Sequence, residues 1–194
     1  PTNIPNQKNK FHGLNYATLG DYQSTFDLRP IRSIIVKQVA PAEDDSSIYE
    51  IFSRLNSGGI NLRPQEIRTS LYHSDFYEML YRVNMDTRWR RLLGIPNPDI
   101  NLKDVEFLLR GFAILIHGNK YSSSMVKFLN DFSRNAKGFN ESGIQYFEEL
   151  FNSFLESCST LANDAFLGTT QRFSITIFES VFVAACSNAF SNQT

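Results

Sequence analysis

The chain has 194 residues, and 19 lysines and arginines against 20 aspartates and glutamates give it a formal net charge of −1. A hydrophobic content of 42% excludes general disorder, and the near-neutral charge provides no overall electrostatic case for binding nucleic acid or an anionic membrane. The composition also contains 17 phenylalanines and 8 tyrosines against a single tryptophan. These numbers predict a folded domain with an aromatic-rich core.

The chain is expected to have no membrane-spanning segment, because its best apolar window, residues 107–117, is short and contains Arg110. The polar residues 1–10 lack the hydrophobic stretch of a secretory signal. Two cysteines, Cys158 and Cys186, are too few for a disulfide framework and are expected to pack as buried, reduced thiols, as in a cytoplasmic protein. The three histidines lie far apart, so no metal site is predicted.

The first predicted element is a strand. Residues 31–39 are dense in β-branched side chains and follow Pro30, which biases the preceding residue toward extended geometry. The fold class predicted from the sequence is therefore mainly α, with one short β element near residues 25–40 followed by a multi-helix bundle. In the alternative, the chain is all α and this segment is irregular.

Helical patterns fill the rest of the chain. Acidic and hydroxyl residues at 44–47 begin a helix whose apolar positions continue to Leu55, and Pro64 suits the first turn of the next helix. Asn101 is expected to cap a helix that ends near Gly118. Further helices are predicted from the apolar patterns near residues 122–137, 142–161 and 173–182. Phe147, Phe151 and Phe154 within them are expected to be core residues.

Charge is unevenly distributed along the chain. Residues 54–91 contain seven arginines and four acidic residues, whereas residues 92–194 contain seven basic and ten acidic residues. Arginine suits planar, bidentate contact with phosphate. Two interpretations stay open: a local phosphate-binding surface, or ordinary exposed charges on helices.

The most specific segment is Phe-Ser-Arg-Leu-Asn-Ser-Gly-Gly-Ile-Asn-Leu-Arg-Pro-Gln-Glu-Ile-Arg at residues 52–68. It resembles the F-x-R-L-N-T/S-G-G-x-x-L-x-x-Q-E-I/L-R stretch of the domain-of-unknown-function 262 family, the GmrSD-type restriction and defence proteins. Weaker similarity extends over residues 88–94, 106–113, 121–130 and 178–182.

The resemblance implies that residues 1–72 are the carboxy-terminal remainder of a ParB/sulfiredoxin-like α/β domain and residues 73–194 a helical domain. It implies a prokaryotic defence protein that uses a nucleoside triphosphate, with Mg²⁺, and acts on DNA. The family's Asp-Gly-Gln-Gln-Arg signature is not in the printed sequence, and neither is its His-Asn-His nuclease domain. Because the chain begins with Pro1 and not with Met, it is interpreted as a fragment without hydrolytic activity of its own.

The resemblance assigns a nucleotide- or phosphate-binding loop to matching positions of this chain: Asn56, Ser57, Gly58, Gly59, Gln65, Glu66 and Arg68. Paired glycines at a helix end can present backbone N–H groups to an anion, and side chains on the next helix can reach the same space. The alternative is a purely structural turn, in which glycine ends one helix and Asn56 and Glu66 satisfy backbone groups of the loop.

Two further expectations come from the residues alone. Glu106 and Arg110 stand four apart in the order that favours an ion pair along one helix. Many aromatic residues and acidic carboxy-terminal helices, without a complete catalytic set, support a second functional hypothesis: a non-catalytic helical interaction module that associates with itself or holds domains together.

Overall fold

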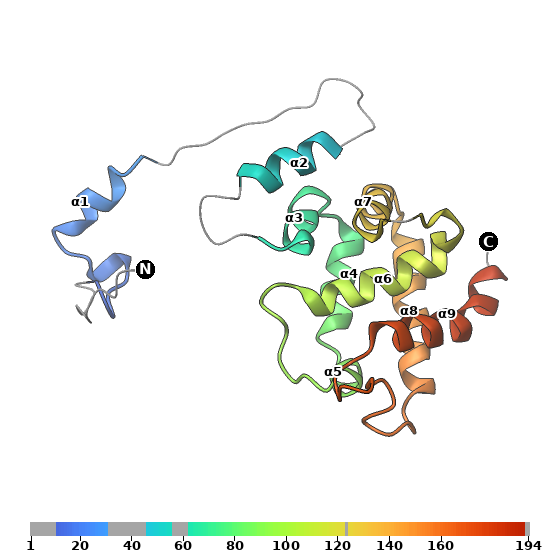
Figure 1. The fold of residues 1–194 in the computed structure, drawn as a ribbon. Coiled ribbons are helices and arrows are strands. Elements are labelled where there is room, and N and C mark those ends of the chain that lie inside the picture. Colours follow the sequence, from blue (N-terminus) through green and yellow to red (C-terminus); the bar gives the residue numbers. More distant parts are fainter. Residues whose placement is uncertain (1–10, 31–45, 56–61, 123, 193–194) are drawn as a thin grey trace. The chain divides into compact units, whose positions relative to one another are not determined.

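The computed structural model describes residues 11–30, 46–55, 62–122 and 124–192, apart from the side chains of Ser46, Ser53 and Leu55 (Figure 1). The structure is mainly helical, as predicted, and the described residues contain one isolated β-bridge, between Leu167 and Phe173, and no strand. The predicted strand at 31–39 lies outside the described residues, and part of the segment expected to be β belongs to helix α1.

The chain divides into two compact units, residues 1–37 and 38–194. The described part of the first unit contains a 3-10 turn, η1 (Tyr16–Thr18), and the short helix α1 (Tyr22–Asp27). Hydrogen bonds from the Tyr16 hydroxyl to the Asp27 carboxylate join the two. No described residue of this unit is buried, so these contacts organise a surface and not a core.

The second unit contains the remaining helices and a 3-10 turn: α2 (Ser46–Leu55), α3 (Pro64–Leu71), α4 (Asp75–Asn84), α5 (Thr87–Leu93), α6 (Lys103–His117), η3 (Gly118–Lys120), α7 (Met125–Ala136), α8 (Glu141–Ser157) and α9 (Ile175–Ser191). The predicted helix starts near residue 46 and at Pro64 are confirmed. Helix α3 contacts α7 within this unit. The domain boundary expected between residues 72 and 73 stays a prediction.

Helix α6 lies at the centre of the unit and contacts α4, α7 and α9, while α8 closes the other side of α4 and α9 (Figure 1). Phe112 of α6 has ring-centre distances of 5.8 Å to Phe76, 5.9 Å to Phe147, 6.0 Å to Phe151 and 5.3 Å to Phe182. Edge-to-face and tilted pairs at these distances add to the free energy gained by burial. The predicted aromatic core is therefore confirmed, and it includes Phe147, Phe151 and Phe154 as expected.

The start of α6 corrects one expectation. The helix begins at Lys103, and the residue before it is Leu102 in the left-handed region, with φ 59°, so Asn101 is not its cap. The Asp99 carboxylate instead accepts from the backbone N–H of Asn101 at 2.8 Å and of Lys103 at 3.4 Å. The short polar side chain that satisfies this helix end thus comes from further upstream than the pattern indicated.

The end of α8 is also earlier than the apolar pattern indicated, at Ser157 and not near residue 161. Arg91 of α5 donates from Nη2 to the Cys158 carbonyl at 2.9 Å and from Nη1 to the Leu161 carbonyl at 3.2 Å. A side chain from another helix therefore satisfies carbonyl groups just beyond α8, which is a contact that no local pattern reveals.

Cys158 and Cys186 are buried and carry free thiols. Burial raises the pKa of both thiols, that of Cys186 to about 11, so both are protonated near neutral pH. Among the described helices, none combines the length and the apolar character that crossing a membrane requires.

Gly111 permits the close approach of α6 and α9. A Cβ atom at Gly111 would lie 2.9 Å from Cε1 of Phe178 and 3.1 Å from Cδ1 of Phe182. We expect Gly111→Ala to lower the free energy of unfolding by about 1 kcal/mol, because overpacking costs roughly 1–3 kcal/mol and the helix propensity of alanine returns only about 1 kcal/mol.

Urea unfolding followed by circular dichroism measures this change. Gly118→Ala is the matched control, since a Cβ there would meet only Ile114 Cγ2 at an ordinary 3.5 Å, and it should leave stability unchanged or raise it by up to about 1 kcal/mol. A Gly111→Ala protein about 1 kcal/mol more stable than the parent would show that the two helices can separate at no cost, because only the helix propensity of alanine would then contribute.

Candidate functional site

Three of the seven residues assigned to the phosphate-binding loop lie in the described structure, all on α3: Gln65, Glu66 and Arg68. The other four, Asn56, Ser57, Gly58 and Gly59, lie outside the described residues. The Glu66 carboxylate turns back and accepts from the backbone N–H of Arg63 at 2.6 Å. Glu66 therefore satisfies the start of its own helix, as the structural alternative predicts.

Arg68 is buried, with 1% of its side chain exposed. Its Nε donates to Asn130 Oδ1 at 2.9 Å, and its Nη1 donates to Gln65 Oε1 and lies 3.3 Å from Glu106 Oε2. These contacts join α3 to α6 and α7. A buried guanidinium needs several acceptors to offset the loss of its hydration, and this set of amide and carboxylate oxygens supplies them.

The polar contacts around Arg68 extend to two tyrosines. Tyr77 of α4 shares a 2.9 Å hydrogen bond with Ser133 of α7, and burial raises the pKa of Tyr77 to about 12 despite the nearby Arg68. The pKa of Tyr49 on α2 is also raised, first by burial, while Arg68 opposes the shift and Glu106 adds to it. Both phenols are therefore neutral near pH 7 and act as hydrogen-bonding groups.

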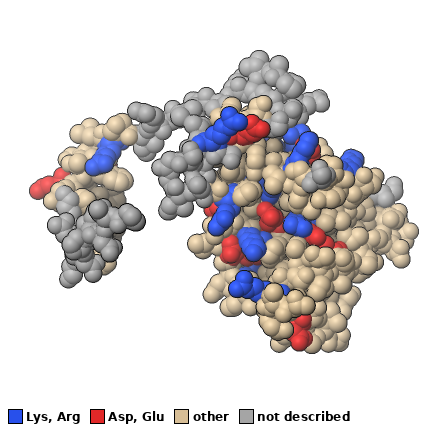
Figure 2. Space-filling view, in the orientation of Figure 1, with Lys and Arg blue, Asp and Glu red and all other residues tan. Residues whose placement is uncertain are grey.

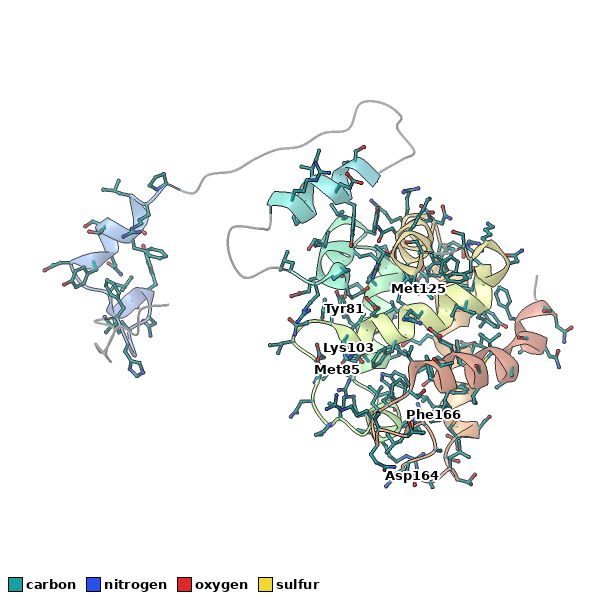
Figure 3. The ribbon with its side chains drawn as sticks, viewed as in Figure 1. Tyr81, Met85, Lys103, Met125, Asp164 and Phe166 are labelled. Atoms are coloured by element: carbon teal, nitrogen blue, oxygen red, sulfur yellow. The ribbon has the colours of Figure 1, made fainter. Side chains whose placement is uncertain are left out.

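A cleft of about 390 Å³ opens where α3, α6 and α7 begin, and we call it the α3/α6/α7 cleft. Lys103 and Met125, labelled in Figure 3, belong to its walls. Its lining residues are Arg63, Pro64, Gln65, Arg68, Asp99, Asn101, Lys103, Glu106, Met125, Val126 and Leu129. Helix N-termini are electropositive, so the beginnings of three helices bias this space toward anions.

The charged residues of the cleft differ in their availability. Glu106 offsets the charge of Arg68, and the Asp99 carboxylate accepts a hydrogen bond from the backbone N–H of Asn101 just before α6. Arg63 and Lys103 are exposed, and the ammonium group of Lys103 lies 5.8 Å from the ring centre of Phe107. The fully exposed charged side chains of the cleft are therefore both cations. Its residues are suited to binding an anion, and no group of three or more potential metal ligands gathers in the described part of the chain.

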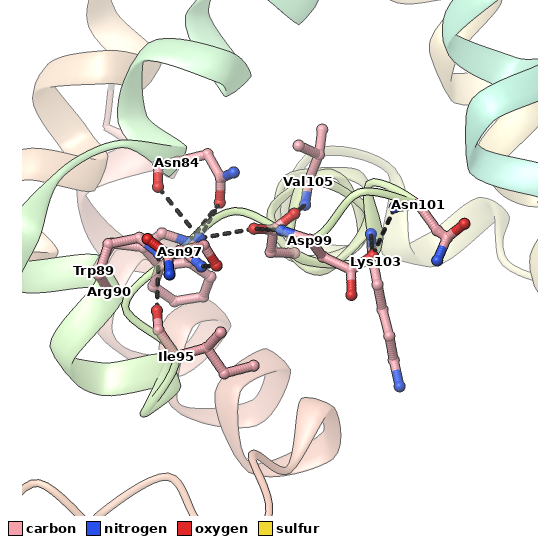
Figure 4. A network of polar contacts seen from close by, with 10 residues as sticks. Asn84, Trp89, Arg90, Ile95, Asn97, Asp99, Asn101, Lys103 and Val105 are labelled. Carbon is pink, nitrogen blue, oxygen red and sulfur yellow. Dashed lines mark hydrogen bonds and ion pairs between the residues drawn. The ribbon is translucent and has the colours of Figure 1, made fainter. Parts of the chain in front are cut away.

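A second buried network, which sequence reasoning missed, holds one wall of the cleft (Figure 4). Arg90 Nη1 lies 2.7 Å from Asp104 Oδ2, and both side chains are almost fully buried. Arg90 also donates to the backbone carbonyls of Ile95 and Asn97, and Asp104 accepts from the Asp99 N–H at 3.0 Å. These bonds fix residues 95–99 and so place Asp99 at the cleft.

The prediction of an ion pair between Glu106 and Arg110 is wrong. Glu106 faces Arg68 of α3, and Arg110 Nε lies 2.5 Å from Glu179 Oε1 of α9. Each residue thus pairs with a neighbouring helix, 38 and 69 positions away along the chain. Nothing in the local spacing could have indicated these partners, because they depend on how the helices pack.

Most of the arginines in residues 54–91 have structural partners. Five of them form ion pairs: Arg54–Glu50, Arg68–Glu106, Arg82–Glu148, Arg88–Asp86 and Arg90–Asp104. Arg91 donates to the carbonyls that follow α8. The local excess of positive charge therefore does not form a continuous phosphate-binding surface. It is largely offset by nearby carboxylates, and only the arginines at 68 and 90 are buried.

Comparison of the chain with protein-family models, with curated proteins and with solved structures finds no match. The resemblance to the domain-of-unknown-function 262 family consequently rests on the matched residues of the sequence and stays a prediction.

Arg68→Met should lower the free energy of unfolding by about 3 kcal/mol. The variant keeps the unbranched apolar part of the side chain but leaves the buried Gln65 and Asn130 oxygens without their donor. Urea unfolding of Arg82→Met gives the control, because the exposed Arg82–Glu148 pair should contribute at most about 1 kcal/mol. An equal decrease in the free energy of unfolding in the two variants would mean that the buried contacts of Arg68 contribute no more to stability than an exposed ion pair.

Asp104 should make stability depend on pH. Burial raises the pKa of this carboxyl, but hydrogen bonds from the Asp99 backbone, Arg90, Asn84 and the Val105 backbone outweigh burial and leave the pKa below its ordinary value of 3.8. The folded state then binds fewer protons than the unfolded state, so this contribution is complete above about pH 5 and is lost as the pH falls through the folded pKa.

We expect Asp104→Asn to be destabilised at pH 6 and the difference from the parent to shrink as the pH approaches 3. Urea titrations between those values measure it. A difference that stays constant across the range would contradict a lowered pKa of Asp104.

Proposed function

We propose that the α3/α6/α7 cleft binds a phosphate-bearing ligand, and that this chain contributes part of a nucleotide site to a longer prokaryotic defence protein. The main support is the exposed pair Arg63 and Lys103 at the point where three helices begin. Such a position combines side-chain charge with the positive ends of the helices, which is the physical requirement for holding a phosphate group.

The roles of the individual residues differ from those that the sequence suggested. Arg63 and Lys103 would contact the anion directly. Arg68 and Gln65, which are buried and bonded to each other, would hold the floor of the cleft in place. Asn56, Ser57, Gly58 and Gly59 belong to the proposed site on the strength of the sequence resemblance.

The proposal assigns binding and support to this chain. Hydrolysis of a nucleoside triphosphate with Mg²⁺, and action on DNA, would belong to other parts of the longer protein, as the resemblance implies. The lining of the cleft provides cations and two partly exposed carboxylates, on Asp99 and Glu106. This set lacks an activated nucleophile paired with a general base, so no chemical step is assigned to it.

A non-catalytic interaction module is the second candidate function. The observation that favours it is that Gln65, Glu66 and Arg68 all serve the fold: Glu66 bonds the start of α3, and the other two bind each other. Residues that the resemblance places in a ligand site are thus explained by structure alone. Under this candidate the cleft is a surface feature without a phosphate ligand.

Charge reversal at the cleft separates the two candidates. The double variant Arg63→Glu plus Lys103→Glu alters only exposed side chains, so it should fold normally. Binding of ATP and of pyrophosphate, measured by isothermal titration calorimetry, should weaken at least about tenfold, because two attractions of up to about 1 kcal/mol become repulsions.

Lys137→Glu plus Arg172→Glu is the matched control, since it makes the same change in net charge at exposed positions outside the cleft lining. Its affinity should equal that of the parent. Parent protein that binds neither probe, or a cleft variant that binds both as tightly as the control, would reject the phosphate site and leave the interaction module.

A further inference from the structure

The α3/α6/α7 cleft has apolar residues as well as cations in its lining. Met125, Val126 and Leu129 line it from the start of α7, and Pro64 lines it from the start of α3; we call these four residues the apolar wall. Residues three and four apart lie on one side of a helix, so Met125 and Val126 both adjoin Leu129. Leu129 is buried, Met125 is half-buried and Val126 has 41% of its surface exposed. The cleft therefore offers a ligand an apolar surface in addition to positive charge.

The volume of the cleft suits a ligand larger than a phosphate group. About 390 Å³ lies within the range of roughly 300–1,000 Å³ that is typical of sites for small organic molecules. Figure 2 shows charged side chains, in blue and red, gathered over the middle of the second unit with uncharged surface in tan beside them, and Figure 3 labels Lys103 and Met125 in this region. A ligand that fills the cleft therefore has an uncharged part as well as its phosphate.

Two amide side chains also line the cleft. Gln65 is buried, and its Oε1 accepts from Arg68. Asn101 is half-buried, and its side-chain amide, which extends away from the network in Figure 4, has no hydrogen-bond partner among the described residues. An amide group can donate and accept at once, so Asn101 is available to bind the polar edge of a ligand.

These features together distinguish between classes of phosphate-bearing ligand. A sugar phosphate would bring hydroxyl groups against the apolar wall, and burial of a hydroxyl without a hydrogen bond is costly. The acyl chains of a phospholipid need a longer apolar groove, because Met125 to Leu129 span little more than one helical turn. The base of a nucleotide has apolar faces and hydrogen-bonding edges, and methionine makes favourable contacts with aromatic rings.

We propose that Met125 and Val126 determine the specificity of the α3/α6/α7 cleft for nucleotides: they hold the base against the first turn of α7, while Arg63 and Lys103 bind the phosphates. This inference rests on the proposed function, because it assigns the uncharged part of the ligand whose phosphates the two cations hold. Neither Met125 nor Val126 lies in residues 56–68, which carry the predicted phosphate-binding loop, so the assignment follows from the lining of the cleft.

Comparison of ATP with inorganic tripolyphosphate isolates the contribution of the uncharged part of the ligand. Tripolyphosphate carries at least as much negative charge as ATP, so a site that responds to charge alone would bind it at least as tightly. Isothermal titration calorimetry of the whole 194-residue chain in buffer without Mg²⁺ measures both affinities. We expect the parent to bind ATP at least about fivefold more tightly, because only ATP buries an apolar face against α7.

The double variant Met125→Gln plus Val126→Thr tests the two residues themselves. Both substitutions keep the approximate size of the side chain but replace apolar atoms with polar ones. The affinity for ATP should fall at least about fivefold, to the level of tripolyphosphate, whose own affinity should not change. Met85→Gln plus Val181→Thr is the matched control, since it makes the same two substitutions at exposed positions outside the cleft lining, and it should bind both probes like the parent. Thermal unfolding should confirm that both variants fold.

The possible outcomes separate this inference from the proposed function. A parent that binds the two probes equally, or a Met125→Gln plus Val126→Thr protein in which both affinities change alike, would overturn the role of the apolar wall and leave the phosphate site in place. A control variant that loses as much ATP affinity as the wall variant would do the same. A parent that binds neither probe would overturn the proposed function and this inference with it.

Discussion

Packing of aromatic rings around α6 is the constraint on which the rest of the second unit depends. Phe112 contacts rings from α4, α8 and α9, so one residue of the central helix determines the position of three others. Gly111, its neighbour, allows α9 to come close enough for these contacts. Close packing of this kind leaves little freedom for the helices to shift. The position of α6, which forms one wall of the cleft, follows from it.

Buried arginines add polar contacts between helices to the packing of the aromatic core. Arg68 connects α3 with α6 and α7, and Arg90 fixes the segment that leads into α6. Arginine suits this task because its planar group can donate to several acceptors at once. The same property makes arginine a phosphate ligand, so an arginine-rich sequence is compatible with both roles. Exposure distinguishes them: Arg68 and Arg90 are buried, whereas Arg63 is open to the cleft.

Helix positions could be predicted well because they follow from local physical chemistry. Proline in the first turn of α3 and the spacing of phenylalanines in α8 indicate these helices without any tertiary contact. The candidate site was predicted only in part. Gln65 and Arg68 do line a cleft, but Lys103 was not among the expected residues, since it is distant in sequence and has no motif of its own. Glu106 and Arg110 show the same limit, because their true partners lie on other helices.

The sequence by itself determined a mainly helical chain, its aromatic core and the charge imbalance between its segments, since these depend on composition and on spacing within one helix. Only the tertiary structure decided which arginines are neutralised, which cations face a cleft, and that apolar side chains of α7 line the same cleft. The physical reason is that burial and pairing arise between helices. The sequence defines the chemical group of each residue, but the helices that pack against that residue determine its exposure and its partners.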